Sequence, residues 1–183
     1  MQTLAEHLLG GPSADGSTES GVSVDRATFF ALMSAFPTGV TVITTLDGDG
    51  EPRGLTSNAV CSVSADPPLL LACVDKGSQT LPAPQESKKF VVNFLSEGRG
   101  GLSNHFASKA PDKFASVVWQ PAGNGMPWLR ADSLAHIECV TAQEIEAGDH
   151  IIFLGRVVGG EPPAPGTHPL MYFRRSYASW PQS

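Results

Sequence analysis

A run of hydroxyl and amide side chains between residues 56 and 64 is the segment of this sequence best suited to binding a ligand. A strand on a sheet surface usually alternates polar and apolar residues, but TSNAVCSVS groups its polar side chains: Thr56, Ser57, Asn58, Ser62 and Ser64. Such a lining suits a flat heterocycle with a hydrogen-bonding edge and an apolar end, as a flavin ring has. A polar strand that faces solvent is the alternative, and this stretch alone leaves both open.

A glycine-hydroxyl turn follows the next apolar strand, in the segment DKGSQT at residues 75–80. Gly77 lets the backbone curve tightly, and Ser78 and Thr80 offer hydroxyls. Lys76 adds a positive charge. These groups could hold a phosphate at a turn rather than at a helix end. An ordinary surface turn is the alternative.

Two further segments carry side chains that could bind a dinucleotide. His150 stands at the start of an apolar strand, where a catalytic base would need a partner that the sequence does not identify. Arg174 and Arg175 lie between Tyr172 and Tyr177, and such a cluster could bind a dinucleotide phosphate. A histidine at a strand entry and a solvated basic segment are the alternatives.

Several other chemistries lack their motifs. There is no G-x-S-x-G nucleophile elbow, no glycine-rich phosphate loop after a strand and no metal-ligand spacing among the histidines. The three cysteines, Cys61, Cys73 and Cys139, are widely spaced and set among apolar neighbours, so we expect free thiols. The formal net charge of −6 argues against a nucleic-acid surface.

The elements that must position these segments are mostly short strands. Residues 1–24 are rich in Gly, Ser, Asp and Thr and are expected to form a flexible tail, so that residues 25–183 form one domain. We find neither a signal-peptide pattern nor an apolar run of about 18 residues, and we expect a cytoplasmic protein. A helix of about ten residues is predicted after Asp25, which is a good N-cap, and before Pro37.

Period-two patterns and turn signals predict the strands 38–46, 51–60, 69–75, 89–95, 115–120, 133–146, 150–158 and 170–175. The strand at 69–75 is apolar throughout and is expected to be buried on both faces. A short helix is predicted at 100–108, with loops at 110–114 and 161–169. Short strands joined by hairpin turns, with few helices, indicate a mainly β fold, an antiparallel barrel rather than a βαβ sheet.

Taken in order, these segments resemble the flavin reductase family of two-component flavin-dependent monooxygenases, whose fold is the FMN-binding split barrel. The resemblance runs from about residue 25 to 180. Its segments are FPTGVTVITT (36–45), GLTSNAVCSVSADPPLLLACV (54–74), KGSQT (76–80), FVVNFL (90–95), FASKAPDKFA (106–115), AGDHIIFLGRV (147–157) and PLMYFRRSY (169–177).

The resemblance implies a role for each matching segment. The isoalloxazine ring would be lined by Thr56, Ser57, Asn58, Ala59, Val60, Ser62 and Val63. The ribityl phosphate would be held by Gly77, Ser78, Gln79 and Thr80, and Phe106 would close the pocket. NAD(P)H would meet His150, with Arg174 and Tyr177 nearby. A homodimer and a separate monooxygenase partner are implied as well.

The resemblance predicts an NAD(P)H:flavin oxidoreductase. Because hydride transfer from nicotinamide to flavin is chemistry that the two cofactors already possess, we expect no essential acid or base, with His150 as the one possible participant. FMN and FAD, and NADH and NADPH, remain equal options. A pyridoxamine-phosphate-oxidase-like enzyme and a non-catalytic flavin- or haem-binding module are the alternatives.

Overall fold

The computed structural model describes residues 23–180, so the tail predicted at 1–24 lies almost entirely outside the described residues. The chain divides into two compact units, residues 1–33 and 34–183. Within residues 23–180, every helix is too short or too polar to span a bilayer.

The first unit contributes helix α1, Arg26–Ser34, close to the predicted position. Asp25 caps it as expected, because its carboxylate accepts hydrogen bonds from the Thr28 backbone N–H at 2.8 Å and the Thr28 hydroxyl at 3.1 Å. The same bonds hold the pKa of Asp25 below its usual value. Most of the apolar side chains of α1 are exposed, namely Phe29, Phe30, Leu32 and Met33.

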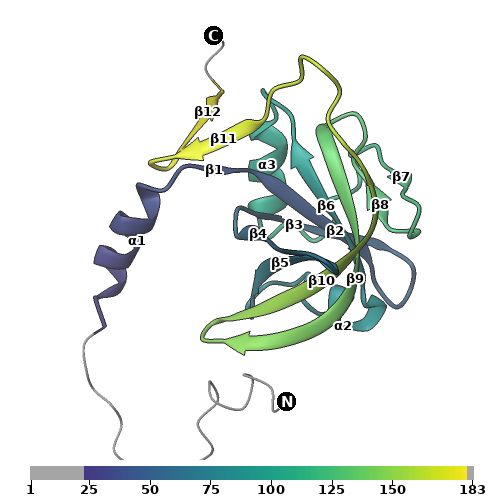
Figure 1. Cartoon of the computed structure of the whole chain (residues 1–183), viewed down its shortest axis with the longest axis horizontal. Helices are drawn as coiled ribbons and strands as arrows, with labels where there is room; N and C mark the ends of the chain where they lie inside the picture. The colour runs from purple at the N-terminus through teal and green to yellow at the C-terminus, as the bar shows by residue number, and fades with distance from the viewer. Residues whose placement is uncertain (1–22, 181–183) are drawn as a thin grey trace, which may run out of the picture. The chain divides into compact units, whose positions relative to one another are not determined.

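The second unit is a seven-stranded antiparallel sheet in the order β3-β2-β6-β9-β10-β5-β4, curled into an open barrel (Figure 1). Its strands are β2 (Thr41–Leu46), β3 (Pro52–Ser57), β4 (Val60–Ala65), β5 (Pro68–Asp75), β6 (Lys89–Leu95), β9 (Ser133–Ala147) and β10 (His150–Glu161). The edge strands β3 and β4 follow one another in sequence, and only Asn58 and Ala59 connect them. This arrangement confirms the predicted split barrel.

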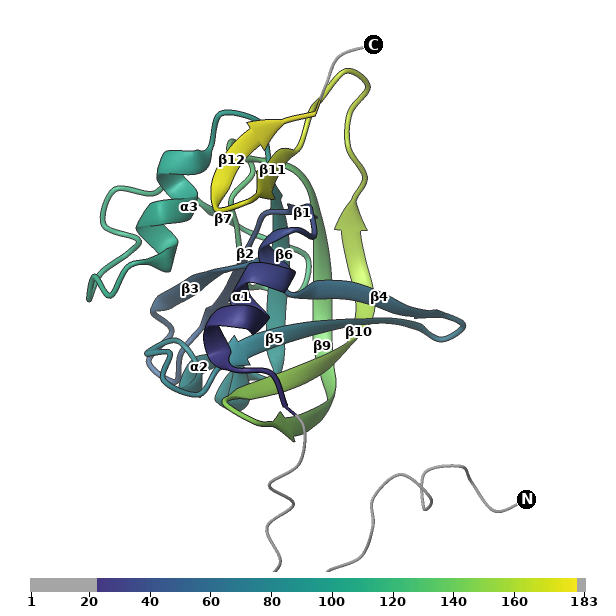
Figure 2. The same ribbon diagram turned by 90° about the vertical axis from the view of Figure 1, so that its left-hand side faces the viewer.

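Smaller elements surround the barrel. They are helices α2 (Pro82–Ser87) and α3 (Gly100–Ala107), the pair β7 (Gln120–Pro121) and β8 (Pro127–Trp128), and a three-stranded sheet of β1 (Thr38–Gly39), β11 (Leu170–Phe173) and β12 (Ser176–Ser179). In both views β11 and β12 lie at one end of the barrel, and α2 and the β9–β10 turn lie at the other (Figures 1 and 2).

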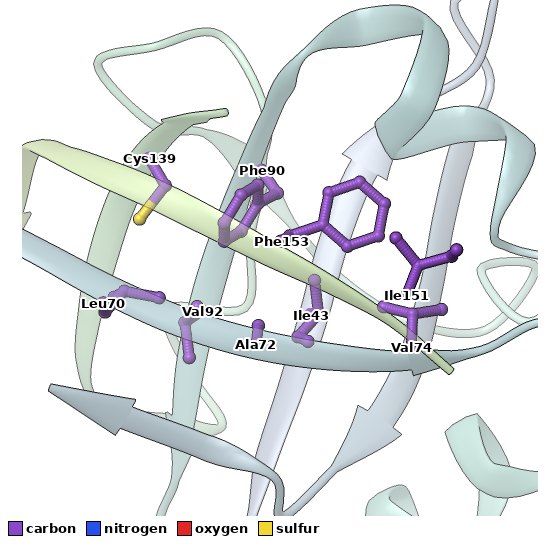
Figure 3. Packing of buried hydrophobic residues seen from close by; sticks show 9 residues of the cluster. All are labelled: Ile43, Leu70, Ala72, Val74, Phe90, Val92, Cys139, Ile151 and Phe153. Atoms are coloured by element: carbon purple, nitrogen blue, oxygen red, sulfur yellow. The ribbon is translucent and has the colours of Figure 1, made fainter. Parts of the chain in front are cut away.

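Alternate side chains of the strands fill the barrel interior (Figure 3). The inner cluster consists of Ile43, Leu70, Ala72, Val74, Phe90, Val92, Cys139, Ile151 and Phe153. Gly155 lies against Phe90 so closely that a Cβ atom there would come within 2.7 Å of the phenyl ring. A second cluster of Val40, Val42, Leu95, Phe106, Phe114, Leu129 and Leu170 packs on the other face of β2 and β6.

Most predicted elements are confirmed, but four expectations are wrong. The predicted strand 51–60 is divided, because β3 ends at Ser57 and β4 begins at Val60. Residues 115–119 form no strand, and only the short β7 begins at Gln120. Strand β5 is buried on one face only: Leu70, Ala72 and Val74 are buried, while the alternate residues are half-buried. The predicted strand at 170–175 is the first arm of a hairpin, because Arg174 and Arg175 take positive φ angles of 48° and 63° and reverse the chain.

Candidate functional site

The end of β3 is fixed in place by the hydroxyls that the sequence analysis selected. The Thr56 hydroxyl donates to the Ser103 carbonyl of α3 at 2.6 Å. The Ser57 hydroxyl donates to the Cys73 carbonyl at 3.4 Å and accepts from the Ala59 backbone N–H at 3.1 Å. Ser57 is itself buried. These two hydroxyls therefore hold the end of β3 in place through hydrogen bonds to other parts of the protein.

Beyond Ser57 the chain comes to the surface. Asn58 and Ala59 are exposed, and the Asn58 amide donates to the Thr38 hydroxyl at 3.3 Å. Val60 is half-buried and packs against the inner cluster. This short segment between the two edge strands offers backbone and amide groups to a ligand, with an apolar side chain beside them.

The rest of the polar run points elsewhere along the sheet. Ser62 pairs with Leu70 and is exposed, and Val63 is also exposed. Since β5 runs from Pro68 to Asp75, these β4 residues lie beside the start of β5, away from the turn that follows its end. The run 56–64 therefore contributes to two separate surfaces. Residues 56–60 lie nearer the turn that follows β5, and Ser62 and Val63 lie farther from it.

The turn at 75–80 uses its own polar groups internally. The Asp75 carboxylate accepts from the Gly77 backbone N–H, the Ser78 N–H donates to the Asp75 carbonyl, and the Ser78 hydroxyl accepts from the Thr80 N–H. The Lys76 N–H donates to the Asp149 carbonyl at 2.9 Å. Most backbone donors of the turn therefore already have partners within the protein.

The predicted ring-binding and phosphate-binding segments meet on β3. The Thr80 hydroxyl, itself buried, donates to the Gly54 carbonyl at 3.0 Å, two residues before Thr56. Ser57 is joined to Cys73, two residues before the turn begins. Residues 54–59 and 75–80 therefore lie at the same edge of the barrel, where the β5–α2 turn is next to β3 (Figure 2).

Phe106 does not form a pocket wall. Its side chain is 0% exposed and packs edge-on against Phe114 with ring centroids 5.1 Å apart. A Cβ atom at Gly54 would come within 2.9 Å of the Phe106 ring. Phe106 therefore supports β3 from beneath, and the expectation that it closes the pocket is corrected to a core role.

Lys113 is a residue of this edge that the sequence analysis did not select. Its ammonium group donates to the Phe106 carbonyl at 2.7 Å and to the Gly54 carbonyl at 3.3 Å. Burial lowers its pKa from the ordinary lysine value. A lysine in the APDKF loop is in itself an unremarkable surface residue, and the signal that distinguishes Lys113 is spatial.

His150 lies beside the turn. It pairs with Asp75 across β10 and β5, and its Nδ1 is 2.7 Å from the Asp149 carboxylate. The side chain of His150 is 40% exposed and that of Asp149 is 86% exposed, so solvent reaches both groups. A neighbouring carboxylate that is itself in water orients the imidazole but gives little support to an acid–base role.

Arg174 and Tyr177 are at the other end of the barrel from His150. The Tyr177 hydroxyl lies 2.9 Å from the Ser103 hydroxyl and 2.8 Å from the Asn104 side-chain oxygen. The Arg174 guanidinium lies 5.0 Å from the Phe173 ring centroid and is exposed. Because β12 and the β9–β10 turn lie at opposite ends (Figures 1 and 2), one chain does not bring these two residues to His150.

Two surface hollows lie outside the exposed segment 58–63. One, of about 570 Å³, is lined by Asp47, Gly48, Asp49, Arg53, Gln79, Pro82, Ala83 and Glu86, and so adjoins the turn. The other, of about 430 Å³, lies where Phe94, His136 and Gly160 come together at the far part of β9 and β10. Neither hollow is lined by residues 58–63.

The open antiparallel barrel places this chain in the split-barrel class. The family described as flavin reductase like domain matches residues 33–181. A protein named flavin reductase (NADH), of Kitasatospora aureofaciens, is 50% identical over 159 residues, which are 86% of this chain and 83% of that protein. The chain belongs to the flavin reductase-like family.

Two other similar proteins bear on the family assignment. HsaB of Mycobacterium tuberculosis, a reductase subunit of a flavin-dependent monooxygenase, is 39% identical over 155 residues, 84% of this chain and 82% of that protein. The solved structure of SgcE6, an NADH:FAD oxidoreductase of Streptomyces globisporus C-1027, has a TM-score of 0.80 at 33% identity over 93% of this chain and 100% of that chain.

Proposed function

We propose that this chain reduces FMN or FAD with NADH or NADPH and passes the reduced flavin to a separate monooxygenase. The observation that carries the proposal is the hydrogen bond from Thr80 to Gly54, which joins the two segments expected at opposite ends of a flavin. The donor set fits that group: amide and backbone groups at 58–59, an apolar side chain at Val60, and the ammonium of Lys113 near the turn.

In the proposed complex, each group of residues has a separate task. Asn58, Ala59 and Val60 would contact the isoalloxazine ring, with Ser62 and Val63 toward its outer side, while Thr56 and Ser57 hold the strand end. Gly77, Ser78, Gln79 and Thr80 would lie toward the ribityl phosphate. The bound cofactors supply the hydride chemistry, and the protein's contribution is to bind and orient them.

We further propose that the working form is a homodimer. In the proposed ring-binding segment 58–63, Asn58, Ala59, Ser62 and Val63 are exposed, and a second subunit would cover them. It would also bring a second Arg174 and Tyr177 toward His150, which one chain does not do. The exposed apolar side chains Phe29, Phe30, Leu32 and Met33 offer a surface for association.

Light scattering coupled to size-exclusion chromatography tests the dimer. The wild-type chain should elute at twice its monomer mass of 19.2 kDa, and Leu32→Glu should weaken the dimer and flavin binding together. The control is Val118→Glu, an even more exposed apolar position in a loop that has no proposed role. A wild-type monomer that reduces flavin at full rate would contradict the dimer proposal.

The reductase activity is tested by following NADH and NADPH oxidation with FMN and with FAD, in all four pairings. At least one pairing should show flavin-dependent consumption in the absence of any oxygenase. Since the reduced flavin must leave, the chain should bind it with modest affinity. A dissociation constant for reduced flavin below the nanomolar range would argue against delivery to a partner. We propose a cytoplasmic location for this reaction, because NAD(P)H is available there. No consumption in any pairing would reject the function.

A further inference from the structure

Lys113 is held in a half-buried position between a helix and the edge strand β3. Its ammonium group donates to the carbonyl of Phe106, in the last turn of α3, and to the carbonyl of Gly54 on β3. Both partners are neutral carbonyl groups. Burial lowers the pKa of Lys113, which is the expected response of a cation removed from water.

Two cations near this edge, Lys76 and Arg53, are paired with carboxylates, but Lys113 is not. Lys76, within the turn, is 3.1 Å from Glu146, and Arg53, beside Gly54, is 2.7 Å from Asp47. Among residues 23–180, Lys113 has no carboxylate partner. A half-buried ammonium without a counter-charge can receive an anion at low cost, because part of its hydration is already lost.

Lys113 reaches the turn through a shared acceptor. The Gly54 carbonyl that it contacts also accepts the hydrogen bond of the Thr80 hydroxyl, so the two donor groups are neighbours. Thr80 ends the turn, and the amides of Gly77, Ser78 and Thr80 are all occupied by partners within it. A phosphate at this turn therefore needs a cation from outside the turn, because the backbone has few donors left.

We propose that Lys113 supplies the positive charge that holds the phosphate of the flavin. This inference rests on the proposed function, since it assigns a residue to the same site. The competing explanation is purely structural: the ammonium caps the C-terminal carbonyls of α3 and ties that helix to β3. The two explanations differ in one measurable respect, because a structural cap does not distinguish a phosphorylated flavin from riboflavin.

The experiment compares the binding of oxidised riboflavin, FMN and FAD to the full chain by quenching of flavin fluorescence. Lys113→Met should raise the dissociation constant for FMN and FAD by about 10- to 100-fold, the loss of one charge-assisted hydrogen bond. The dissociation constant for riboflavin should stay within about twofold. Lys113→Arg should keep most of the preference for FMN.

Two further variants separate charge from helix capping. Lys113→Gln keeps an N–H donor for the Phe106 carbonyl and removes the charge, so it should lose FMN affinity while its thermal unfolding midpoint stays closer to wild type than that of Lys113→Met. Lys109→Met removes an exposed lysine from the same loop and should leave all three flavins unaffected.

The binding measurements distinguish failure of the Lys113 inference from failure of the proposed function. An equal loss of FMN and riboflavin affinity in Lys113→Gln would overturn the inference in favour of the structural role. A wild-type chain that binds riboflavin as tightly as FMN would also overturn it, while leaving the reductase function intact. A wild-type chain that binds no flavin and oxidises no NAD(P)H would instead reject the proposed function itself.

Discussion

Thr56 and Tyr177 contact the same residue, Ser103, although they are far apart in the sequence. The Thr56 hydroxyl donates to the Ser103 carbonyl at 2.6 Å, and the Tyr177 hydroxyl is 2.9 Å from the Ser103 hydroxyl. Ser103 is fully buried in α3. Helix α3 therefore connects the strand end that would face the flavin to the C-terminal hairpin that would face the dinucleotide.

This connection predicts that Tyr177→Phe destabilises the protein and disturbs flavin binding. The change removes one half-buried hydrogen bond, to Ser103, and one exposed hydrogen bond, to Asn104, and the free energy of unfolding should fall by about 1 to 2 kcal/mol in urea titrations. Tyr172→Phe is the matched control, because its ring packs against Tyr177 but its hydroxyl has no hydrogen bond among residues 23–180. Equal stability of the two variants would show that the Ser103 link contributes nothing.

Replacing Gly155 with alanine should destabilise the barrel. A Cβ atom there would lie 2.7 Å from the Phe90 ring and 3.0 Å from the Cys139 Cβ. Overpacking of this kind costs about 1 to 3 kcal/mol. Gly101→Ala, in α3 with no atom within 4 Å of the new Cβ, should be neutral or stabilising by comparison. Thermal unfolding of both variants measures the difference, and a Gly155→Ala protein as stable as wild type would disprove the close packing.

His150→Ala should weaken the use of NAD(P)H and leave appreciable turnover. His150 is half-exposed and is oriented by a solvent-exposed carboxylate, an arrangement suited to binding rather than to proton transfer. We expect the KM for the nicotinamide to rise while kcat falls less than tenfold. Steady-state kinetics with saturating flavin give both numbers. A drop in kcat of more than about a thousandfold, or roughly 4 kcal/mol, would mean that His150 moves a proton in catalysis.

The three thiols should differ in reactivity. Burial, with a further contribution from Glu138, raises the pKa of Cys139 to about 12, and burial also raises the pKa of Cys73. The thiolate is the reactive form, so at pH 8 a maleimide reagent should modify exposed Cys61 first and Cys139 only after unfolding. Mass spectrometry of peptides labelled with and without urea reads out the order. Labelling of Cys139 in the native protein would indicate that the inner cluster opens.

The barrel could be predicted from sequence because its strands are β-branched and apolar and are separated by turn signals. The strand at 150–158 begins with every second residue in the core, whereas the apolar run at 89–95 is buried on both faces. Asp25 likewise predicted the start of its helix, because an N-cap residue bonds to a residue only three positions further along the chain. The strand expected at 115–120 is absent over 115–119, and Val118, one of the β-branched residues that favoured it, is exposed.

The site itself was only partly predictable. The sequence selects the segments 56–64 and 75–80, but the internal partners of their hydroxyls and amides depend on tertiary contacts, which the sequence pattern does not show. Lys113 was missed for the same reason, because its meaning comes from Gly54 and Thr80, which are far from it in the chain. The separation of Tyr177 from His150 follows from the path of the last hairpin, which composition does not encode.

The two-residue turn of that hairpin has a consequence for engineering. A backbone with positive φ at both positions accepts Asn–Gly readily, whereas each arginine costs about 1 kcal/mol or more there. Substituting Asn–Gly for Arg174 and Arg175 should therefore raise the melting temperature, and it removes two adjacent cations from the turn between β11 and β12. Thermostability and affinity for a polyanionic coenzyme would then vary in opposite directions at a single bend of the chain.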